Sequence, residues 1–466
     1  MSTITYTQLL RGNRSFRRLW SGQVVSELGN WFNFIAALGL VRSVSVAAPE
    51  ATATMLVARL APFALFAPLA GAFVDRWSRR TVMIVSDAAR AVVALGFLLV
   101  RGPEDLWIAY TCTVVATLLA AFFEAAKNAA MPNITGGQGL LAGNALMFSS
   151  RFLLMSFGAA LGGWASARFG YKAAFIINAV SFLVSAYSIW LIPEEAIKRE
   201  TSGEDEMSRE AETREAAIHE TERRTARRAA QRHTRVWTDL HEGWKYIARY
   251  PLLAAIIGVN VLWATGGGAC NLIYDRLGGV VFAGRGGLEG DAGVAALYAA
   301  VGAGVFFGMV LARRVGAHVE LHGATAKFIG WMLLAHGVVF ALAGLMPTLF
   351  LVGAMLFLSR LIIGMEFAVQ ETLMMRLVPD HLRGRVITTD RAAEIFVTSI
   401  STIFAAWSLH AITPRTLTIV SGLLSATPGL FWLALFASGR LHLPAHLETA
   451  RETDAAEEQE LLASAG

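Results

Sequence analysis

Polar and ionisable side chains that could bind a solute or a proton occur inside long apolar segments of this sequence. In the segment 19–41, Gln23, Glu27, Asn30 and Phe34 fall on one face of a helix. Glu27 would lie about 12 Å from the helix end at a rise of ~1.5 Å per residue, so this polar stripe suits a cavity wall. The other candidates inside apolar segments are Arg90, Arg151, Arg360, Glu366 and Gln370.

These charged side chains need a compensating role, because each costs about 2.5–3.5 kcal/mol at the centre of a bilayer. Three roles are open. A buried carboxylate such as Glu27 could hold a proton when the site is empty and release it when a cationic solute binds. An arginine could instead bind the carboxylate or phosphate of an anionic solute. Alternatively, arginine and glutamate pair with each other and only hold helices together.

A second charged cluster is a short loop after the apolar segment 51–74. Its glycine would allow two helices to approach closely, its aspartate could accept hydrogen bonds from a neighbouring helix, and its arginines could bridge to acidic groups. Two carboxylates fall near the same ends of the next two segments, and we interpret them as structural or gating partners of this loop. The loop residues are Gly71, Asp75, Arg76, Arg79 and Arg80, and the partners are Asp87 and Glu124.

Twelve apolar segments must position these groups. Each is long enough to cross a hydrocarbon core of about 30 Å, where only a helix satisfies its own backbone hydrogen bonds. The sequence therefore predicts an all-α membrane protein with twelve transmembrane helices. The segments are 19–41, 51–74, 81–100, 106–126, 140–167, 173–192, 252–273, 291–312, 326–345, 348–373, 386–411 and 416–438.

The charged residues between the segments predict the topology. Loops rich in arginine alternate with poorer ones, and the positive-inside rule then places both termini in the cytoplasm. We expect residues 1–193 to form one six-helix bundle and 251–440 a second. Residues 194–250 form a charged cytoplasmic linker that ends in an amphipathic interfacial helix near 236–247. Residues 441–466 form a cytoplasmic tail.

The two halves resemble a duplicated unit. The loop that begins at Gly71 has a counterpart in Gly308–Gly316, which we place after the eighth segment. Met131-Pro132-Asn133 is matched at a similar offset by Val378-Pro379-Asp380. Repeated six-helix halves are typical of secondary transporters, which bind substrate between the halves near the membrane midplane.

Composition excludes several other classes of protein. Hydrophobic residues make up 55% of the chain and charged residues only 16%, against about a quarter in soluble domains. The basic residues cluster in loops and match no nucleic-acid motif. Neither a phosphate-binding loop nor a converging set of catalytic side chains is present, so we expect no enzyme activity, no cofactor and no metal site. The N-terminal segment carries no cleavage signal and is predicted to stay as a membrane helix.

The stretch Gly71-Ala-Phe-Val-Asp75-Arg76-Trp-Ser-Arg79-Arg80 resembles the signature between helices 2 and 3 of the major facilitator superfamily. The resemblance covers nearly the whole chain apart from residues 195–235 and the tail. It implies a fold of two pseudo-symmetric six-helix bundles. It also implies that this loop latches the halves in the outward-facing state and must break for inward opening.

Other passages resemble the macrolide-efflux and enterobactin-exporter group of that superfamily. They are the opening Phe16–Gly29, the lead-in Trp237–Pro251 and the segment Val378–Val386. Gly158, Gly162 and Gly163 are similar to the antiporter motif of the family, although Ala159 replaces its proline. The fourth segment also lacks the arginine that many proton-coupled drug exporters carry there.

The resemblance implies a secondary active transporter that exports an amphipathic small molecule of drug or siderophore type by alternating access, with protons as the candidate coupling ion. A lipid or lysophospholipid flippase of the same fold is the alternative within transport. A non-transporting membrane receptor is the alternative of another class. We expect a monomer, multi-pass in the cytoplasmic (inner) membrane, whose partners are the substrate, protons and the lipid bilayer.

Overall fold

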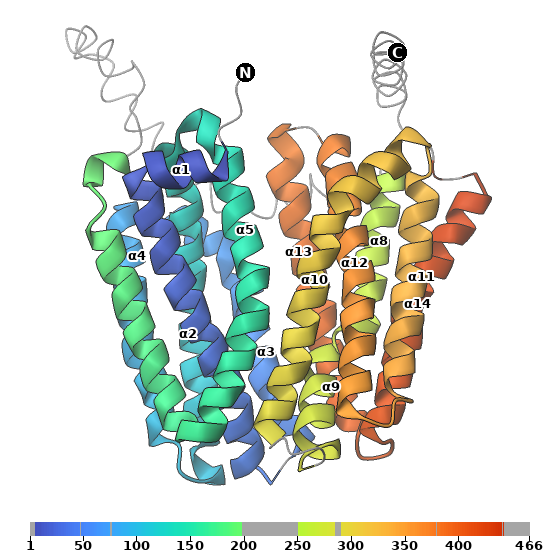
Figure 1. The fold of residues 1–466 in the computed structure, drawn as a ribbon, viewed down its shortest axis with the longest axis horizontal. Helices are drawn as coiled ribbons and strands as arrows, with labels where there is room; N and C mark the ends of the chain where they lie inside the picture. The colour runs from blue at the N-terminus through green and yellow to red at the C-terminus, as the bar shows by residue number, and fades with distance from the viewer. Residues whose placement is uncertain are drawn as a thin grey trace, which may run out of the picture.

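The computed structural model describes residues 5–46, 48–74, 77–197, 250–284, 290–378, 380–439 and 441. These residues form helices and connecting turns (Figure 1). The predicted amphipathic helix near 236–247, most of the linker and the tail after Leu441 lie outside the described residues, as do Asp75 and Arg76 of the charged loop.

The N-terminal half begins with a short helix, α1 (Tyr6–Gly12), followed by α2 (Arg14–Val44), α3 (Pro49–Val74) and α4 (Arg79–Gly96). The long helix α5 (Leu106–Trp190) is broken at Gly136 and Gly170, whose φ angles of 67° and 76° favour glycine. It therefore runs as three legs, 106–136, 137–170 and 171–190. Short 3₁₀ turns (Phe97–Leu99, Pro103–Asp105 and Glu194–Ala196) complete this half.

The C-terminal half begins with an interrupted helix made of α8 (Pro251–Gly267), α9 (Cys270–Arg276) and the π-helical turn η5 (Leu277–Val281). It continues through α10 (Gly290–Leu321), α11 (Thr325–Ala343), α12 (Leu349–Leu377), α13 (Asp380–Ser408) and α14 (Pro414–Ala437). Threonine side chains cap two of these helices: Thr348 accepts from the backbone N–H of Leu351, and Thr413 from that of Thr416.

The prediction of twelve spanning helices is confirmed. Nine segments of the described residues are long and apolar enough to cross a membrane. One of them, 142–190, bends back at Gly170 and so supplies two crossings. The helices α3 and α13, of 26 and 29 residues, are the remaining two.

The repeat of the charged loop differs from the prediction in its local structure. The helix α10 continues to Leu321, so Gly308–Gly316 is helical instead of a loop. The close packing that glycine allows is retained there, because a Cβ on Gly308 would meet Gly364 Cα of α12 at 3.1 Å. The fourth span likewise extends through Pro132 to Gly136.

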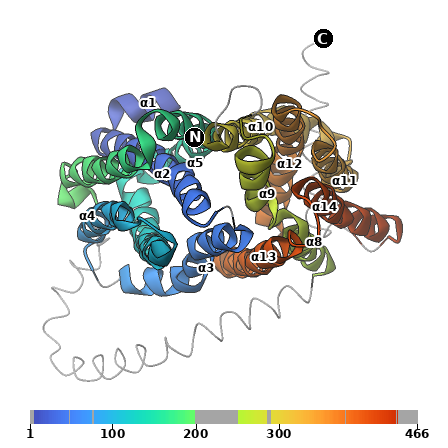
Figure 2. The ribbon, with the colours of Figure 1, turned by 90° about the horizontal axis from the view of Figure 1, so that it is seen from below.

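The six-helix halves lie side by side, and α1 and the C-terminal end of α14 lie at the same end of the molecule (Figure 1). We call this end the terminal face and the other end the opposite face. Toward the opposite face the halves meet, with α5 packed on α10 and α3 beside α13 (Figure 2). A buried apolar cluster there joins residues of both halves, including Phe34, Leu38, Leu56, Tyr274 and Tyr298.

Candidate functional site

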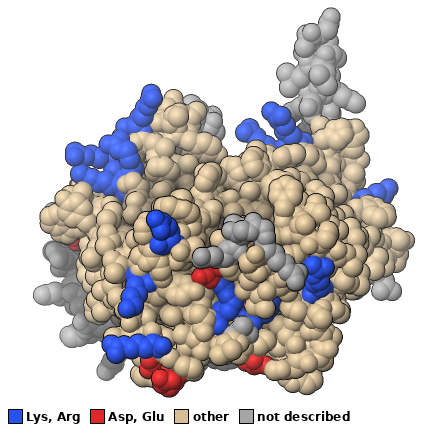
Figure 3. All heavy atoms as spheres, turned by 60° about the horizontal axis from the view of Figure 1, so that its bottom comes forward, with Lys and Arg blue, Asp and Glu red and all other residues tan. Residues whose placement is uncertain are grey.

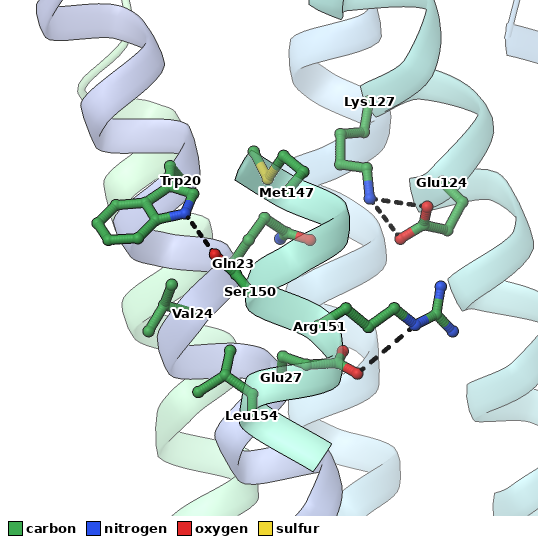
Figure 4. Close-up of a pocket in the computed structure, with 10 residues that line it drawn as sticks. All are labelled: Trp20, Gln23, Val24, Glu27, Glu124, Lys127, Met147, Ser150, Arg151 and Leu154. Atoms are coloured by element: carbon green, nitrogen blue, oxygen red, sulfur yellow. Dashed lines mark hydrogen bonds and ion pairs between the residues drawn. The ribbon is translucent and has the colours of Figure 1, made fainter. Parts of the chain in front are cut away.

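A recess lies in the N-terminal half, between α2 and the first two legs of α5 (Figure 4). Its walls carry both polar and apolar side chains, as expected of a site for an amphipathic molecule. Of the predicted polar stripe, Gln23 and Glu27 line the recess, and Asn30 contacts Glu27. The lining residues are Trp20, Gln23, Val24, Glu27, Glu124, Lys127, Met147, Ser150, Arg151 and Leu154.

Glu27 and Arg151 face each other across this recess (Figure 4). Arg151 Nε lies 3.9 Å from Glu27 Oε1, and Asn30 Nδ2 donates to Glu27 Oε2 at 3.4 Å. Both contacts are long, and 68% of the Arg151 side chain is exposed. The pair is therefore accessible and loosely held, unlike a buried ion pair that fixes two helices. Gln23 Nε2 lies 3.5 Å from Ser185 Oγ and so faces the third leg of α5.

Glu124 belongs to the recess as well. Lys127 Nζ donates to both oxygens of its carboxylate at 2.7 Å. The guanidinium of Arg151 extends toward this pair and interacts electrostatically with Glu124 (Figure 4). The structure thus places Glu124 beside this recess, whereas the sequence pattern predicts a partner of the charged loop.

An arginine that interacts with two recess residues, and an aromatic cluster, lie between the recess and the other half. Arg59 of α3 stacks 4.4 Å from the Phe34 ring and interacts electrostatically with Glu27 and Arg151. The Phe34 ring contacts Trp31 at 5.5 Å and Tyr298 of α10 at 5.3 Å. These aromatic residues separate the recess from the opposite face.

Beyond the aromatic cluster, buried ion pairs close the opposite face. Arg42 of α2 is bonded to Asp275 of α9 and to Asp291 of α10, so one guanidinium joins the two halves. Arg276 Nη2 donates to Asp275 Oδ2 at 2.5 Å and to Thr52 Oγ1 at 2.7 Å. Figure 3 brings this face forward and shows acidic and basic side chains together where the halves meet. We call Arg42, Thr52, Asp275, Arg276 and Asp291 the seam.

Two further contacts join the halves. Glu50 of α3 is bonded to His410 near the surface of the opposite face. Ser156 Oγ of α5 donates to the Ala299 carbonyl of α10 at 2.8 Å. Together with the seam, these contacts join the two halves. The recess lies on the terminal-face side of the seam, because its α2 residues precede Arg42 along that helix, and the Arg151 side chain that lines it is 68% exposed.

The antiporter-like glycines lie where α5 meets its neighbours. A Cβ on Gly158 would lie 2.8 Å from Trp31 Cβ, and one on Gly162 would lie 3.0 Å from Phe32 Cα. Both glycines therefore bring α5 against α2 and support the aromatic cluster. Gly163 faces the other half, where a Cβ would lie 3.2 Å from the Asp291 carbonyl oxygen.

Arg360 is deeply buried in the C-terminal half. Its Nε and Nη2 atoms donate to Tyr274 Oη at 3.1 and 2.5 Å, and Nη2 also contacts Cys270 Sγ at 3.0 Å. Within the described residues, no carboxylate is paired with it. The Tyr274 ring contacts Tyr298 at 5.3 Å, so Arg360 stands behind the aromatic cluster.

The other candidates of this half form a separate polar network. Gln370 Nε2 donates to Asn260 Oδ1 at 2.7 Å, and Asn260 Nδ2 donates to both Asp390 oxygens at 3.2 and 3.1 Å. These hydrogen bonds join α12, α8 and α13. Glu366, one turn before Gln370, is 2% exposed, and its Oε1 has no partner among the described residues.

Arg90 and Asp87 are bonded to each other within α4, three residues apart. The Arg90 guanidinium also stacks 4.7 Å from Phe123 and 4.4 Å from Phe182. These contacts place both residues in the packing of the N-terminal half. Neither side chain lines the recess, although both interact electrostatically with Glu124, which does. In the charged loop, Arg79 Nη1 donates to the Ala129 carbonyl at 2.9 Å, and Arg80 is bonded to the Trp190 carbonyl. Gly71 lies in the last turn of α3.

Sequence reasoning missed the seam. Neither Arg42 nor the pair Asp275-Arg276 is among the candidates that the sequence pattern predicts. A signal was available, because two opposite charges follow an apolar run at the end of the seventh span. Which partner each of them meets depends on how the two halves pack.

Twelve helices in two halves, with a polar recess beside their interface, are the architecture of a multi-pass membrane transport protein. Residues 19–389 match the family model described as Major Facilitator Superfamily. Because this match covers well over half of the chain, the chain belongs to the Major Facilitator Superfamily.

The curated relatives agree with this family. An uncharacterized MFS-type transporter of Mycobacterium tuberculosis is 26% identical over 406 residues, which is 82% of each chain. The uncharacterized MFS-type transporter YfiS of Bacillus subtilis is 25% identical over 249 residues, or 53% of this chain and 52% of the relative. The chain thus spans about half the length of the Bacillus subtilis relatives it matches.

Solved structures show the same fold. A bacterial homologue of the human lysosomal transporter Spinster, inward-facing and occupied, superposes with a TM-score of 0.64 at 12% identity, over 91% of this chain and 96% of that one. A bacterial homologue of the iron transporter ferroportin, inward-facing, gives 0.62 at 14% identity, over 90% and 98% of the chains.

Proposed function

We propose that this protein exports an amphipathic small molecule from the cytoplasm by alternating access. The observation that carries the proposal is the arrangement of seam and recess. The seam joins the halves at the opposite face, while a recess with polar and apolar walls and an exposed arginine lies on the terminal-face side of it. A transporter captured before it moves its cargo would have this geometry.

The orientation of this opening follows from the loop charges. The arginine-rich loops and both termini belong to one face, and the positive-inside rule assigns that face to the cytoplasm. The recess then opens inward. The resemblance of Phe16–Gly29 and Val378–Val386 to drug and siderophore exporters supports export as the direction of transport.

Coupling to protons would depend on Glu27. It is the recess carboxylate that is not held by a short ion pair, since Glu124 is bonded twice to Lys127. A loosely held, partly exposed carboxylate can exchange a proton with the cytoplasm when the recess is open.

Cross-linking across the opposite face tests alternating access. Glu50 and His410 come from different halves, are in contact and have side chains 50% and 64% exposed, so cysteines placed there can react from outside. A short bifunctional thiol reagent should join Glu50→Cys to His410→Cys and stop transport, and a reducible reagent should allow recovery. The matched controls are Glu50→Cys alone and His410→Cys alone, each of which also retains Cys112 and Cys270.

Transport itself is measured as energy-dependent efflux from cells stripped of their own pumps, with cationic dyes, macrolides and a catecholate siderophore as the panel. Reagent-dependent loss of efflux in the double variant alone supports the proposal. Efflux that continues at the control rate after complete cross-linking, or no efflux of any compound by the unmodified chain, contradicts it.

A further inference from the structure

The recess, taken together with the neighbouring Arg59, has a surplus of positive charge. Two carboxylates, Glu27 and Glu124, meet three cations, Lys127, Arg151 and Arg59. Lys127 neutralises Glu124 at 2.7 Å, and Glu27 alone faces both arginines. Arg59 forms no ion pair with any described carboxylate, and its guanidinium only stacks on Phe34.

An arginine without a counter-charge is unfavourable inside a membrane, since it costs a few kcal/mol on insertion scales. Arg360 has the same deficit in the other half, where a phenol and a thiol are its hydrogen-bond partners. Tyr274 and Tyr298 lie between the two arginines. The zone between the halves therefore presents positive charge from both sides.

A neutral donor in the same place also lacks an acceptor. The indole Nε1 of Trp31 is buried and has no hydrogen-bond partner within the described residues. Trp31 packs on Phe34 and Tyr298, with ring centroids 5.5 and 5.9 Å apart. Buried donors are nearly always satisfied, so an unsatisfied one beside an unpaired arginine indicates a missing acceptor.

From this combination we infer that the recess binds an anionic group attached to an apolar or aromatic body. Arg59 and Arg151 hold the carboxylate, sulfonate or phosphate, and Trp31, Phe34 and Tyr298 contact the body. The inference rests on the proposed function in that the recess is the substrate route, and it narrows the cargo to anions. A cationic solute in the recess would be repelled by Arg59 and Arg151, and Glu27, the recess carboxylate without a short ion pair, already faces both of them.

Three dansyl compounds with one aromatic body and different charges test this inference: anionic dansylglycine, neutral dansylamide and cationic dansylcadaverine. Binding to the full chain in lipid nanodiscs is measured by fluorescence titration, with no gradient and no turnover. We expect dansylglycine to bind at least tenfold more tightly than either of the others. Because a charge-assisted hydrogen bond contributes more than a neutral one, Arg59→Gln should weaken dansylglycine about tenfold and change dansylamide less than twofold.

Three variants keep the result interpretable. Arg59→Lys retains the charge and should recover part of the affinity. Arg168→Gln removes an exposed arginine at the far end of the same leg of α5 as Arg151, and should bind dansylglycine as the unmodified chain does. Arg151→Gln should weaken dansylglycine in the same direction as Arg59→Gln. Equal binding of the three probes, or dansylglycine affinity unchanged in both Arg59→Gln and Arg151→Gln, overturns the inference.

Competition distinguishes two sources of the anion. Displacement of dansylglycine by lysophosphatidylglycerol, lost in Arg59→Gln, assigns the site to a lipid headgroup. Failure of the lysolipid to displace it, with displacement by naphthalene-sulfonate, assigns it to a soluble organic anion. Binding and export are separate readouts. Arginine-dependent binding without efflux supports the anion site and contradicts the proposed export. Efflux without charge selectivity supports export and contradicts the anion site.

Discussion

At the scale of single residues, the pairing of each charge decides whether it can act. Arg90 with Asp87 and Lys127 with Glu124 are bonded within hydrogen-bond distance on one helix, three residues apart, and so are structural pairs. Glu27 is different, because its contacts of 3.4 and 3.9 Å leave it free to change partner. Of the recess residues it is therefore the best candidate for a proton carrier.

Glu27→Gln should uncouple transport from the proton gradient. An amide cannot release a proton, so concentrative uptake into inverted vesicles should fall at least tenfold, whereas exchange of substrate at equal concentrations should continue. The measurement compares the two with the compound that the efflux panel identifies. Glu104→Gln, an exposed carboxylate before α5, is the control. Gradient-driven uptake at the unmodified rate in Glu27→Gln would remove this residue from coupling.

At the scale of elements, close approach of α2 and the second leg of α5 builds the recess. Gly158 and Gly162 are one turn apart on α5, and any side chain there would press on Trp31 or on the backbone of Phe32. The loss of the motif's proline to Ala159 does not disturb this face, because Ala159 is fully buried in the cluster that joins the halves. Membrane helices commonly pack through small residues in this way.

Gly162→Ala should destabilise the protein. The added methyl group would lie 3.0 Å from Phe32 Cα, so backbone must move, and overpacking of this kind costs about 1–3 kcal/mol. Reversible unfolding in a detergent titration measures the change. Gly258→Ala in α8, where a Cβ would meet nothing within 4 Å, is matched in chemistry and should unfold as the unmodified chain does. Equal stability of the two variants would mean that this helix contact is not tight.

At the scale of the whole molecule, the seam determines which end is closed. Arg42 of the N-terminal half bonds both Asp275 and Asp291 of the C-terminal half through its guanidinium. Asp275 is fully buried. Opening of this face requires that these bonds break, so their strength sets part of the balance between the two states.

Arg42→Gln should shift the population toward a state open at the opposite face. Removal of one partner from a buried ion pair typically costs 3–5 kcal/mol, and only the closed state bears that cost here. Spin labels at the exposed positions Glu104 and Phe350, one in each half near this face, report the separation by pulsed electron resonance. We expect a population with longer distances.

A charge reversal is the control for this experiment. Arg42→Asp with Asp291→Arg restores one inter-half bond and should return part of the population to the shorter distance. Distances unchanged in Arg42→Gln would show that the apolar cluster alone closes this face.

The helices and their polar faces could largely be predicted from the sequence alone. Apolar runs of membrane length predict helices because an unpaired backbone is too costly in lipid, and the observed bounds of α2, α3 and α12 differ from the predicted ones by only a few residues. The same local rule found the polar stripe of Gln23, Glu27 and Asn30, since residues three and four apart share a helical face.

Only the tertiary structure decided which charges meet. Glu27 pairs with Arg151 at a sequence separation of more than a hundred residues, and Arg42 pairs with Asp275 across the two halves. Arg59 forms no ion pair with a carboxylate among the described residues. Helical periodicity fixes the face on which a side chain lies but not the rotation and depth at which two helices pack. The rotation and depth of packing depend on the glycine contacts and the aromatic cluster. They decide whether a buried charge belongs to a structural pair, belongs to the seam or, like Arg59, has no ion-pair partner.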